Sequence, residues 1–270
     1  MTYKNKWALV TGASAGIGAT FARSYAAKGA NIVLVARREE RMRDLAAELE
    51  ERHGVKTRIV AADLAEPDAP QRIYDALSAD GIVVDILVNN AGFGLPGVYT
   101  ENDWAAHRAY LELMLVSYAH MTRLFLPGML ARDYGRIIQV ASLAGLVPGS
   151  AGHTLYGPSK AFLISFAQSI AAECDGTGVN SSAVCPGFTY SEFHDVNKTR
   201  GLVSQLPKHM FMEAEPVVEG AIDAVEKGRA VYVPGAWNKF TAWLARTLPR
   251  SWAEKMVTNQ SKRFRKQTGH

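Results

Sequence analysis

The stretch Thr11-Gly12-Ala13-Ser14-Ala15-Gly16-Ile17-Gly18 stands between an apolar run near the N-terminus and a segment of helical period. Glycines let a chain turn tightly and bring its backbone N–H groups close to a pyrophosphate, and the N-terminus of a following helix adds positive potential. A plain tight turn is the alternative, but the position between strand and helix favours a phosphate-binding loop. The residues that we expect to contact the phosphates are Gly12, Ser14, Ala15, Gly16, Ile17 and Gly18.

Outward from this loop, short β-branched runs alternate with longer segments of helical period, as in the segment from Glu39 to His53. This alternation is typical of βαβ units, and runs that are apolar on both faces indicate strands covered by helices above and below. We therefore predict an α/β fold, a single doubly wound domain with a parallel, roughly seven-stranded sheet flanked by helices. The expected strands are Trp7 to Thr11, Asn31 to Ala36, Lys56 to Ala61, Ile86 to Val88, Arg136 to Ala141, Val179 to Val184 and Ala230 to Val233.

The second expected strand ends in Val35-Ala36-Arg37-Arg38. An NAD site normally places an acidic residue here to bind the ribose 2′-hydroxyl, and Ala36 removes that acid. Arg37 and Arg38 instead offer planar donors that suit a 2′-phosphate, and no charge partner is evident for them in this pattern. The alternative is an arginine pair that opens an amphipathic helix and faces water. We predict that the cofactor is NADP(H).

Two further motifs follow later strands: Asn89-Asn90-Ala91-Gly92, and Tyr156-Gly157-Pro158-Ser159-Lys160 at an expected helix start. Together with the glycine loop, Asp63-Leu64, Ser142 and Pro186-Gly187, they occur in an order and at spacings that resemble the short-chain dehydrogenase/reductase family. The resemblance covers roughly Lys6 to Pro234 and implies a Rossmann-type catalytic domain over residues 1–235. We expect residues 236–270 to form a helical and basic extension packed on the same domain.

Tyr156 and Lys160 are four residues apart, so they share one face of a helix, and Pro158 suits its first turn. A lysine ammonium and a helix N-terminus both favour the phenolate, so we expect the pKa of Tyr156 to be lowered toward neutrality. The resemblance implies that Tyr156 protonates the substrate oxygen as hydride arrives and that Lys160 also holds the nicotinamide ribose. Ser142, at the end of the fifth strand, is expected to hydrogen-bond the substrate oxygen.

The resemblance also assigns residues that line the cofactor cleft, for each of which an ordinary strand-end turn is the alternative. Asp63 and Leu64 are expected at the adenine, and Thr189 at the carboxamide or a phosphate. A tight turn at Pro186-Gly187 would pass beneath the nicotinamide. The residues expected to bind the cofactor here are Asp63, Leu64, Asn90, Ala91, Gly187 and Thr189. Cys185 is expected to be a buried small hydrophobe rather than a nucleophile.

One position departs from the family pattern within the expected helix from Trp104 to Leu126. Met114 stands where the family has an asparagine that helps to hold a water between the lysine and solvent, and methionine is a poor hydrogen-bond partner. Either another group, such as Ser117 one turn on, supports the proton relay, or proton exchange is slow. A cofactor-binding scaffold or sensor with little turnover is therefore the alternative to an active enzyme.

The residues expected to surround the substrate are mostly apolar: Phe93, Leu143, Leu146, Val147, His153, Leu155, Phe188, Tyr190 and Phe193. They favour a bulky or long-chain carbonyl compound or secondary alcohol, although the same side chains would also pack a lid over an empty site. The two histidines of this region, His153 and His194, are interpreted as loop residues exposed to solvent rather than substrate contacts.

The composition bounds the remaining predictions. The net charge of +4 is concentrated in the C-terminal segment, which speaks against nucleic-acid binding. The two cysteines are too few for a disulfide framework or a metal site, and with no expected signal peptide or membrane span they indicate the cytoplasm. Aromatic residues from Trp237 onward, followed by the basic tail, fit either a helix that caps its own domain or a weak contact with a membrane surface or partner subunit. The resemblance implies a homodimer or homotetramer.

Overall fold

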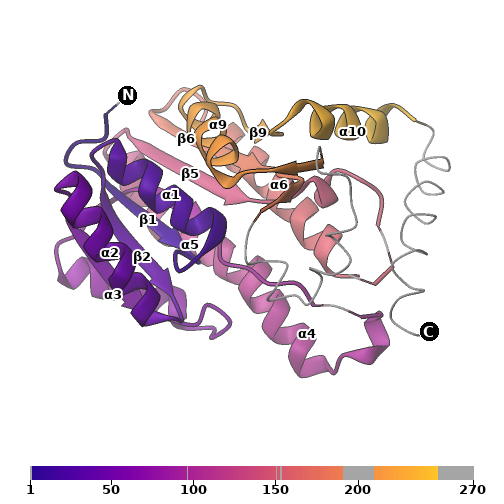
Figure 1. The fold of residues 1–270 in the computed structure, drawn as a ribbon, viewed down its shortest axis with the longest axis horizontal. Coiled ribbons are helices and arrows are strands. Elements are labelled where there is room, and N and C mark those ends of the chain that lie inside the picture. The colour runs from indigo at the N-terminus through magenta and orange to yellow at the C-terminus, as the bar shows by residue number, and fades with distance from the viewer. Residues whose placement is uncertain (1, 96, 150, 153, 191–209, 249–270) are drawn as a thin grey trace.

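The structure is a computed structural model that describes residues 2–95, 97–149, 151–152, 154–190 and 210–248. Its main sheet has seven strands in the order β3-β2-β1-β4-β5-β6-β9, and all of its neighbouring strands are parallel (Figure 1). The strands of this sheet are β1 (Trp7–Thr11), β2 (Asn31–Ala36), β3 (Thr57–Ala61), β4 (Val84–Asn89), β5 (Gly135–Val140), β6 (Val179–Val184) and β9 (Val231–Tyr232). The doubly wound sheet predicted from the sequence is therefore confirmed, with strand ends that differ by one or two residues.

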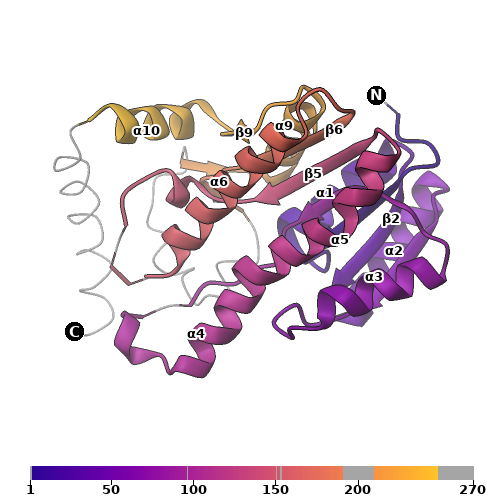
Figure 2. The same ribbon diagram turned by 180° about the vertical axis from the view of Figure 1, so that it is seen from behind.

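Helices cover both faces of the sheet. The α-helices of the described residues are α1 (Gly16–Ala27), α2 (Glu39–His53), α3 (Ala69–Ala79), α4 (Trp104–Leu111), α5 (Ser117–Ala131), α6 (Tyr156–Glu173), α9 (Ala214–Glu226) and α10 (Ala236–Thr247). α1, α2 and α9 lie on the face toward the viewer in Figure 1, and α3, α5 and α6 lie on the opposite face, which Figure 2 shows. Each described helix is too short or too polar to cross a bilayer.

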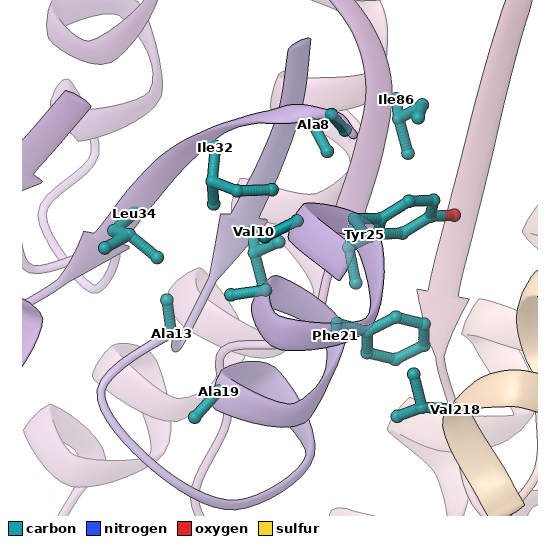
Figure 3. Close-up of a cluster of buried hydrophobic side chains, with 14 of the residues drawn as sticks. Ala8, Val10, Ala13, Ala19, Phe21, Tyr25, Ile32, Leu34, Ile86 and Val218 are labelled. Carbon is teal, nitrogen blue, oxygen red and sulfur yellow. The ribbon is translucent and has the colours of Figure 1, made fainter. Parts of the chain in front are cut away.

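Each face of the sheet has its own apolar core, because successive side chains of a strand point to opposite sides. In β1, Ala8 and Val10 join the core beneath α1, whereas Leu9 joins the core beneath α3 and α5. Figure 3 shows Phe21 and Tyr25 of α1 packed among side chains from β1, β2 and β4. This double burial is the reason that the strands are apolar throughout.

The helix expected from Trp104 to Leu126 is wrong in its detail. α4 ends at Leu111, a π-helical turn spans Glu112–Val116, and α5 then continues past Pro127 to Ala131. A π turn adds one residue to the helical repeat, and such turns are frequent at functional sites. Simple apolar spacing does not reveal it, because the side chains on both sides of the insertion still face the core.

The carboxyl ends of the parallel strands meet at one edge of the sheet, where ligands bind in open α/β folds. The glycine loop follows β1, the arginine pair follows β2, Asn90 follows β4 and Ser142 follows β5. Beyond β6, the short β7 (Phe188–Thr189) pairs in parallel with β8 (Phe211–Met212). The topology therefore collects at one edge most of the motifs that the sequence analysis singled out.

Candidate active site

The glycine loop is packed so closely that side chains are excluded from it. Gly12 has a φ of +66°, and a Cβ atom there would lie 2.8 Å from Asn90 Nδ2. A Cβ atom on Gly18 would lie 2.3 Å from the carbonyl oxygen of Gly12, far inside van der Waals contact. α1 begins at Gly16, directly after this turn. The residues therefore fit a pyrophosphate cradle, with backbone in place of side chains and a helix N-terminus behind it.

The loop is held by the segment that follows β4. The Thr11 hydroxyl accepts hydrogen bonds from the backbone N–H groups of Asn90 at 2.8 Å and Ala91 at 3.0 Å. The Asn90 amide in turn donates to the carbonyl oxygen of Thr11 at 2.9 Å. The Asn90 side chain thus braces the glycine loop, and Thr11 is a bracing residue that the sequence analysis missed. A threonine at the end of a buried strand was the signal for it.

The arginine pair after β2 lies at the same end of the sheet. Arg38 donates from Nε and Nη2 to the Ser14 hydroxyl at 3.3 and 3.1 Å, so it reaches across to the glycine loop. Arg37 forms an ion pair with Asp63, with 3.6 Å between Nη1 and Oδ2. The expectation that the pair lacks a charge partner is therefore wrong, because β2 and β3 are neighbours and bring Asp63 beside Arg37. A cavity of about 230 Å³ opens next to Ser14, between α1 and α2, and Arg23 and Arg41 line it.

Asp63 and Leu64 have different surroundings. Asp63 also accepts a hydrogen bond from the backbone N–H of Ala65 at 3.0 Å, which fixes its carboxylate at the end of β3. The side chain of Leu64 is buried in the core beneath α3.

Ser142, Tyr156 and Lys160 come together at the end of β5. Ser142 precedes a 3₁₀ turn (Leu143–Gly145), and its hydroxyl accepts the Ala144 N–H at 3.2 Å. This turn rests on the first turns of α6, since a Cβ atom on Gly145 would lie 2.6 Å from the backbone carbon of Lys160. α6 begins at Tyr156, which confirms the predicted helix start. Gly145 therefore allows the serine and the tyrosine to be neighbours.

Burial shifts the pKa values of Tyr156 and Lys160 in opposite directions. Burial raises the pKa of Tyr156, and a side-chain hydrogen bond with Ser142 opposes this rise. Burial lowers the pKa of Lys160 to about 7. The Lys160 Nζ atom donates to the Val140 carbonyl at 2.8 Å and lies 5.8 Å from the centre of the Tyr156 ring. The expectation that the pKa of Tyr156 is lowered is therefore wrong, because burial dominates and the Lys160 amine donates to a carbonyl instead.

Two further tyrosines surround this cluster. The Tyr110 hydroxyl pairs with the Ser159 hydroxyl at 2.9 Å, and Ser159 donates to the Tyr156 carbonyl at 2.9 Å. The Tyr118 hydroxyl donates to the Ala91 carbonyl at 2.9 Å, and its ring centre lies 5.9 Å from Lys160 Nζ. The hydrogen bonds that run from Tyr110 through Ser159 to Tyr156 thus connect α4 to the first turn of α6. The sequence analysis missed these two tyrosines, because the spacing of apolar residues does not distinguish a tyrosine at the site from one in the core.

The geometry agrees with comparisons to known proteins. A family model for short chain dehydrogenases matches residues 6–200. The chain belongs to this family. Among its relatives is the 7beta-hydroxysteroid dehydrogenase of Collinsella aerofaciens, 30% identical over 234 residues that cover 87% of this chain and 88% of the relative. Another is a very-long-chain 3-oxoacyl-CoA reductase of Anas platyrhynchos, 31% identical over 267 residues that cover 96% of this chain and 81% of the relative.

A solved short-chain dehydrogenase from Sphingobium yanoikuyae, in complex with NADPH, has a TM-score of 0.78 and 28% identity to this chain. The match covers 90% of this chain and 96% of the other. The protein is therefore an oxidoreductase of the short-chain dehydrogenase family, which acts on alcohol or ketone substrates and uses a nicotinamide cofactor.

Met114, which departs from the family pattern, lies in the π-helical turn between α4 and α5. The Met114 side chain is fully buried within the π turn, and its sulfur would lie 3.0 Å from a Cβ atom on Gly92. Ser117, the expected substitute in the relay, donates its hydroxyl proton to the Leu113 carbonyl at 2.6 Å. In this short-chain dehydrogenase, the Ser117 hydroxyl proton is therefore bound to the carbonyl one turn earlier in the same helical segment. The role of Ser117 in the proton relay stays a hypothesis.

Beyond β6, the turn at Pro186-Gly187 is packed against the C-terminal helix. A Cβ atom on Gly187 would lie 2.3 Å from the Asn238 amide oxygen of α10. Thr189 is buried, and its hydroxyl donates to the Gly187 carbonyl at 3.3 Å. Cys185 is fully buried in a small core with α6, as expected of a hydrophobe. The short-chain dehydrogenase thus anchors its C-terminal helix on the turn that ends β6.

Several residues expected to line the substrate site contact one another or the cluster above. Phe93 packs edge-to-face on Tyr110 at 5.5 Å between ring centres, and Tyr190 stacks on Phe211 at 4.9 Å. The Phe93 ring is thus connected, through Tyr110 and Ser159, to the first turn of α6. His153, Phe193 and His194 lie outside the described residues.

Proposed function

We propose that this short-chain dehydrogenase is an NADPH-dependent oxidoreductase that interconverts a ketone or aldehyde with the corresponding alcohol. The observation that carries the proposal is the cluster of Ser142, Tyr156 and Lys160 at the same sheet edge as the glycine loop. A buried phenol beside a serine hydroxyl and a buried amine can place one proton on a substrate oxygen. The alternative, a binding scaffold without turnover, does not account for this convergence.

Each residue of the cluster has a separate part in the reaction. A nicotinamide cofactor held at this edge of the sheet would supply or accept the hydride. The Tyr156 hydroxyl transfers its proton to the carbonyl oxygen, so that carbonyl, hydride and proton become the alcohol and leave a phenolate. The Ser142 hydroxyl, which is within hydrogen-bond reach of Tyr156, turns its proton to the same oxygen as negative charge develops there. Lys160 in its protonated form stabilises the phenolate until a proton returns from solvent, and its low pKa puts this change of charge near neutrality. Lys160 also holds the nicotinamide ribose in this proposal.

A preference for NADPH is supported by the arginines after β2. Arg38 already holds the Ser14 hydroxyl, so its guanidinium stands at the mouth of the glycine loop. Ala36 provides no carboxylate to bind a ribose 2′-hydroxyl, whereas Arg37 and Arg38 provide planar guanidinium donors for a 2′-phosphate. Arg37 shares its charge with Asp63, so Arg38 is the main donor in this proposal. The relative from Sphingobium yanoikuyae is described as an NADPH complex. Asp63, paired with Arg37, and the backbone of Leu64 would face the adenine in this arrangement.

The substrate that we propose is bulky or long and largely apolar. Two aromatic clusters support this proposal: Phe93 with Tyr110, and Phe211 with Phe188 and Tyr190. The names of the two relatives, which refer to a steroid and to a very-long-chain acyl group, support the same class. We further propose a homodimer or homotetramer in the cytoplasm, with residues 1–235 as the catalytic domain and 236–270 as its extension.

The test is oxidation of NADPH and NADH by the purified protein with a panel of aromatic, alicyclic and long-chain carbonyl compounds. Turnover with NADPH that is lost in Tyr156→Phe, with the fold intact by circular dichroism, is the expected result. Tight NADPH binding without turnover on any compound would favour the scaffold. A preference for NADH would overturn the assignment of Arg37 and Arg38.

A further inference from the structure

α10 presents its large aromatic side chains to solvent and its small ones to the protein. Phe240 is 49% exposed and Trp243 is 58% exposed, whereas Asn238 and Ala242 are buried. At about 100° per residue, Phe240 lies about 160° from both Asn238 and Ala242, and Trp243 lies about 140° from Asn238 and about 100° from Ala242. A helix that only caps its own domain would bury the aromatic side, so this arrangement reverses the usual one.

The buried side of α10 is fixed, so the helix cannot roll to cover its aromatic side. The Asn238 amide donates to the Pro234 carbonyl at 2.8 Å, and its oxygen meets the Gly187 backbone so closely that no Cβ atom fits between them. Figures 1 and 2 show α10 at the margin of the molecule, beside β9 and away from the other helices of the sheet. Any rotation of α10 would break the contact with the turn that ends β6.

The exposed side forms a continuous aromatic surface, here called the α10 aromatic face and defined as Trp237, Phe240 and Trp243. Trp237 is itself 47% exposed, and consecutive ring centres along the face are 6.0 Å apart. Contiguous exposed apolar surface on a soluble domain marks a binding surface. Tryptophan in particular is enriched where an apolar phase meets water, because its ring is large and its indole N–H is polar.

The charged residues of α10 itself are both positive. Lys239 and Arg246 are exposed on one flank of the helix. The sequence has no aspartate or glutamate from Gly228 to Ala253, and residues 249–270 contain six lysines and arginines against one glutamate. An aromatic helical face that continues into a basic segment matches a surface whose interior is apolar and whose headgroups are anionic.

We propose that the α10 aromatic face docks on an anionic lipid bilayer, with the helix lying in the plane of the interface. At 12 residues, α10 is about 18 Å long, which is too short to span the membrane. A second copy of the chain is a poorer occupant, because a two-fold interface on this face would bring two sets of the same cations together. Docking would place the turn at Gly187 roughly one helix diameter, about 10 Å, from the lipid, because this turn packs on the buried side of α10.

The experiment is sedimentation of the full chain with vesicles of phosphatidylcholine alone or with about one third phosphatidylglycerol. We expect binding to the anionic vesicles that weakens sharply at about 0.5 M NaCl, where charges are screened within a few ångströms. The variant Phe240→Ser/Trp243→Ser should bind about tenfold more weakly or worse, because it removes the apolar contact. Trp104→Ser is the matched control, since Trp104 is 64% exposed but lies on α4, and it should bind like the wild type.

A second variant, Lys239→Glu/Arg246→Glu, keeps the aromatic face and should lose affinity for anionic vesicles severalfold. NADPH binding and the melting temperature show whether each variant is folded, so failure of docking is distinguishable from failure of the proposed activity. Equal vesicle binding by the wild type and the aromatic variant would overturn the proposal. It would also be overturned if the wild type ignored anionic vesicles while the aromatic variant changed from dimer to monomer in gel filtration, which would assign the face to a second copy.

Discussion

Two turns of this molecule have the same construction and different chemistry. The glycine loop follows β1 and the Ser142 turn follows β5, each after a buried parallel strand and each against the start of a helix. In each turn, a glycine lies so close to neighbouring backbone atoms that a Cβ atom would not fit. Gly18 lies against Gly12 in the first turn, and Gly145 lies against Lys160 in the second. The first turn offers backbone N–H groups. The second brings together a hydroxyl, a phenol and an amine.

The comparison shows how one fold separates binding from chemistry. Backbone amides do not titrate, so the glycine loop can hold a phosphate over a wide range of pH. The Ser142 turn instead depends on side chains whose proton affinities are set by burial, which raises the pKa of Tyr156 and lowers the pKa of Lys160 to about 7. Substitutions at the two turns should therefore affect different steps.

The largest effect is expected for Tyr156→Phe. Loss of the proton donor should reduce kcat by about a thousandfold or more, since positioned acid–base groups contribute on the order of 10²–10⁴. The dissociation constant for NADPH, measured by fluorescence titration, should change little. Tyr110→Phe is the matched control, because it removes a buried hydroxyl that contacts Ser159 rather than the substrate oxygen. A Tyr156→Phe enzyme that keeps most of its turnover would contradict the assignment of the second turn to the chemistry.

The pair Gly18→Ala and Gly145→Ala tests the comparison directly. Gly18→Ala should push the Gly12 carbonyl out of its position in the loop. We expect NADPH binding to weaken about a hundredfold, which is the size of loss that a displacement of about 1 Å causes at a binding or catalytic site. Gly145→Ala should instead lower kcat about as much while NADPH binding is kept, because it shifts Ser142 away from Tyr156. Gly149→Ala is a suitable control, since nothing lies within 4 Å of a Cβ atom there. If both variants lost cofactor binding equally, the two turns would not be functionally separate.

A smaller effect is expected for Arg38→Ala. The dissociation constant for NADPH should rise about ten- to thirtyfold, in line with one charge-assisted contact, and that for NADH should hardly change. Arg37→Ala should have a smaller effect, because Arg37 is shared with Asp63. Arg43→Ala, which loses only an exposed ion pair with Glu39, provides the baseline. Equal losses for NADPH and NADH would mean that Arg38 acts on the loop alone.

The smallest effect is on stability. Lys160 has a pKa of about 7 in the folded protein and an ordinary value of 10.5 when unfolded. Below pH 7 both states are protonated and the folded state has the full cost of a buried ammonium; as pH rises from 7 toward 10.5, only the folded state loses the proton and stability increases. Lys160→Met should therefore raise the melting temperature by a few degrees at pH 6 and by less at pH 9.5. Lys239→Met, at an exposed lysine, is the control for the loss of a lysine side chain.

Much of the fold and of the site was predictable because it depends on local pattern. The apolar runs identified all seven strands of the main sheet, since strands buried on both faces need such runs. The start of α6 at Tyr156 followed from the spacing of Tyr156 and Lys160 and from Pro158 in the first turn. The π turn at Met114 was not predictable, because one added residue leaves the apolar spacing on either side unchanged.

The sequence by itself determined the order of strands and helices, the glycine loop and the identity of the groups at the strand ends. Only the tertiary structure decided how those groups affect one another. It placed Asp63 beside Arg37, turned the Lys160 ammonium toward the Val140 carbonyl, and left the α10 aromatic face outside the core. The reason is that pairing, burial and proton affinity depend on neighbours far apart in the chain, and only packing brings these neighbours together.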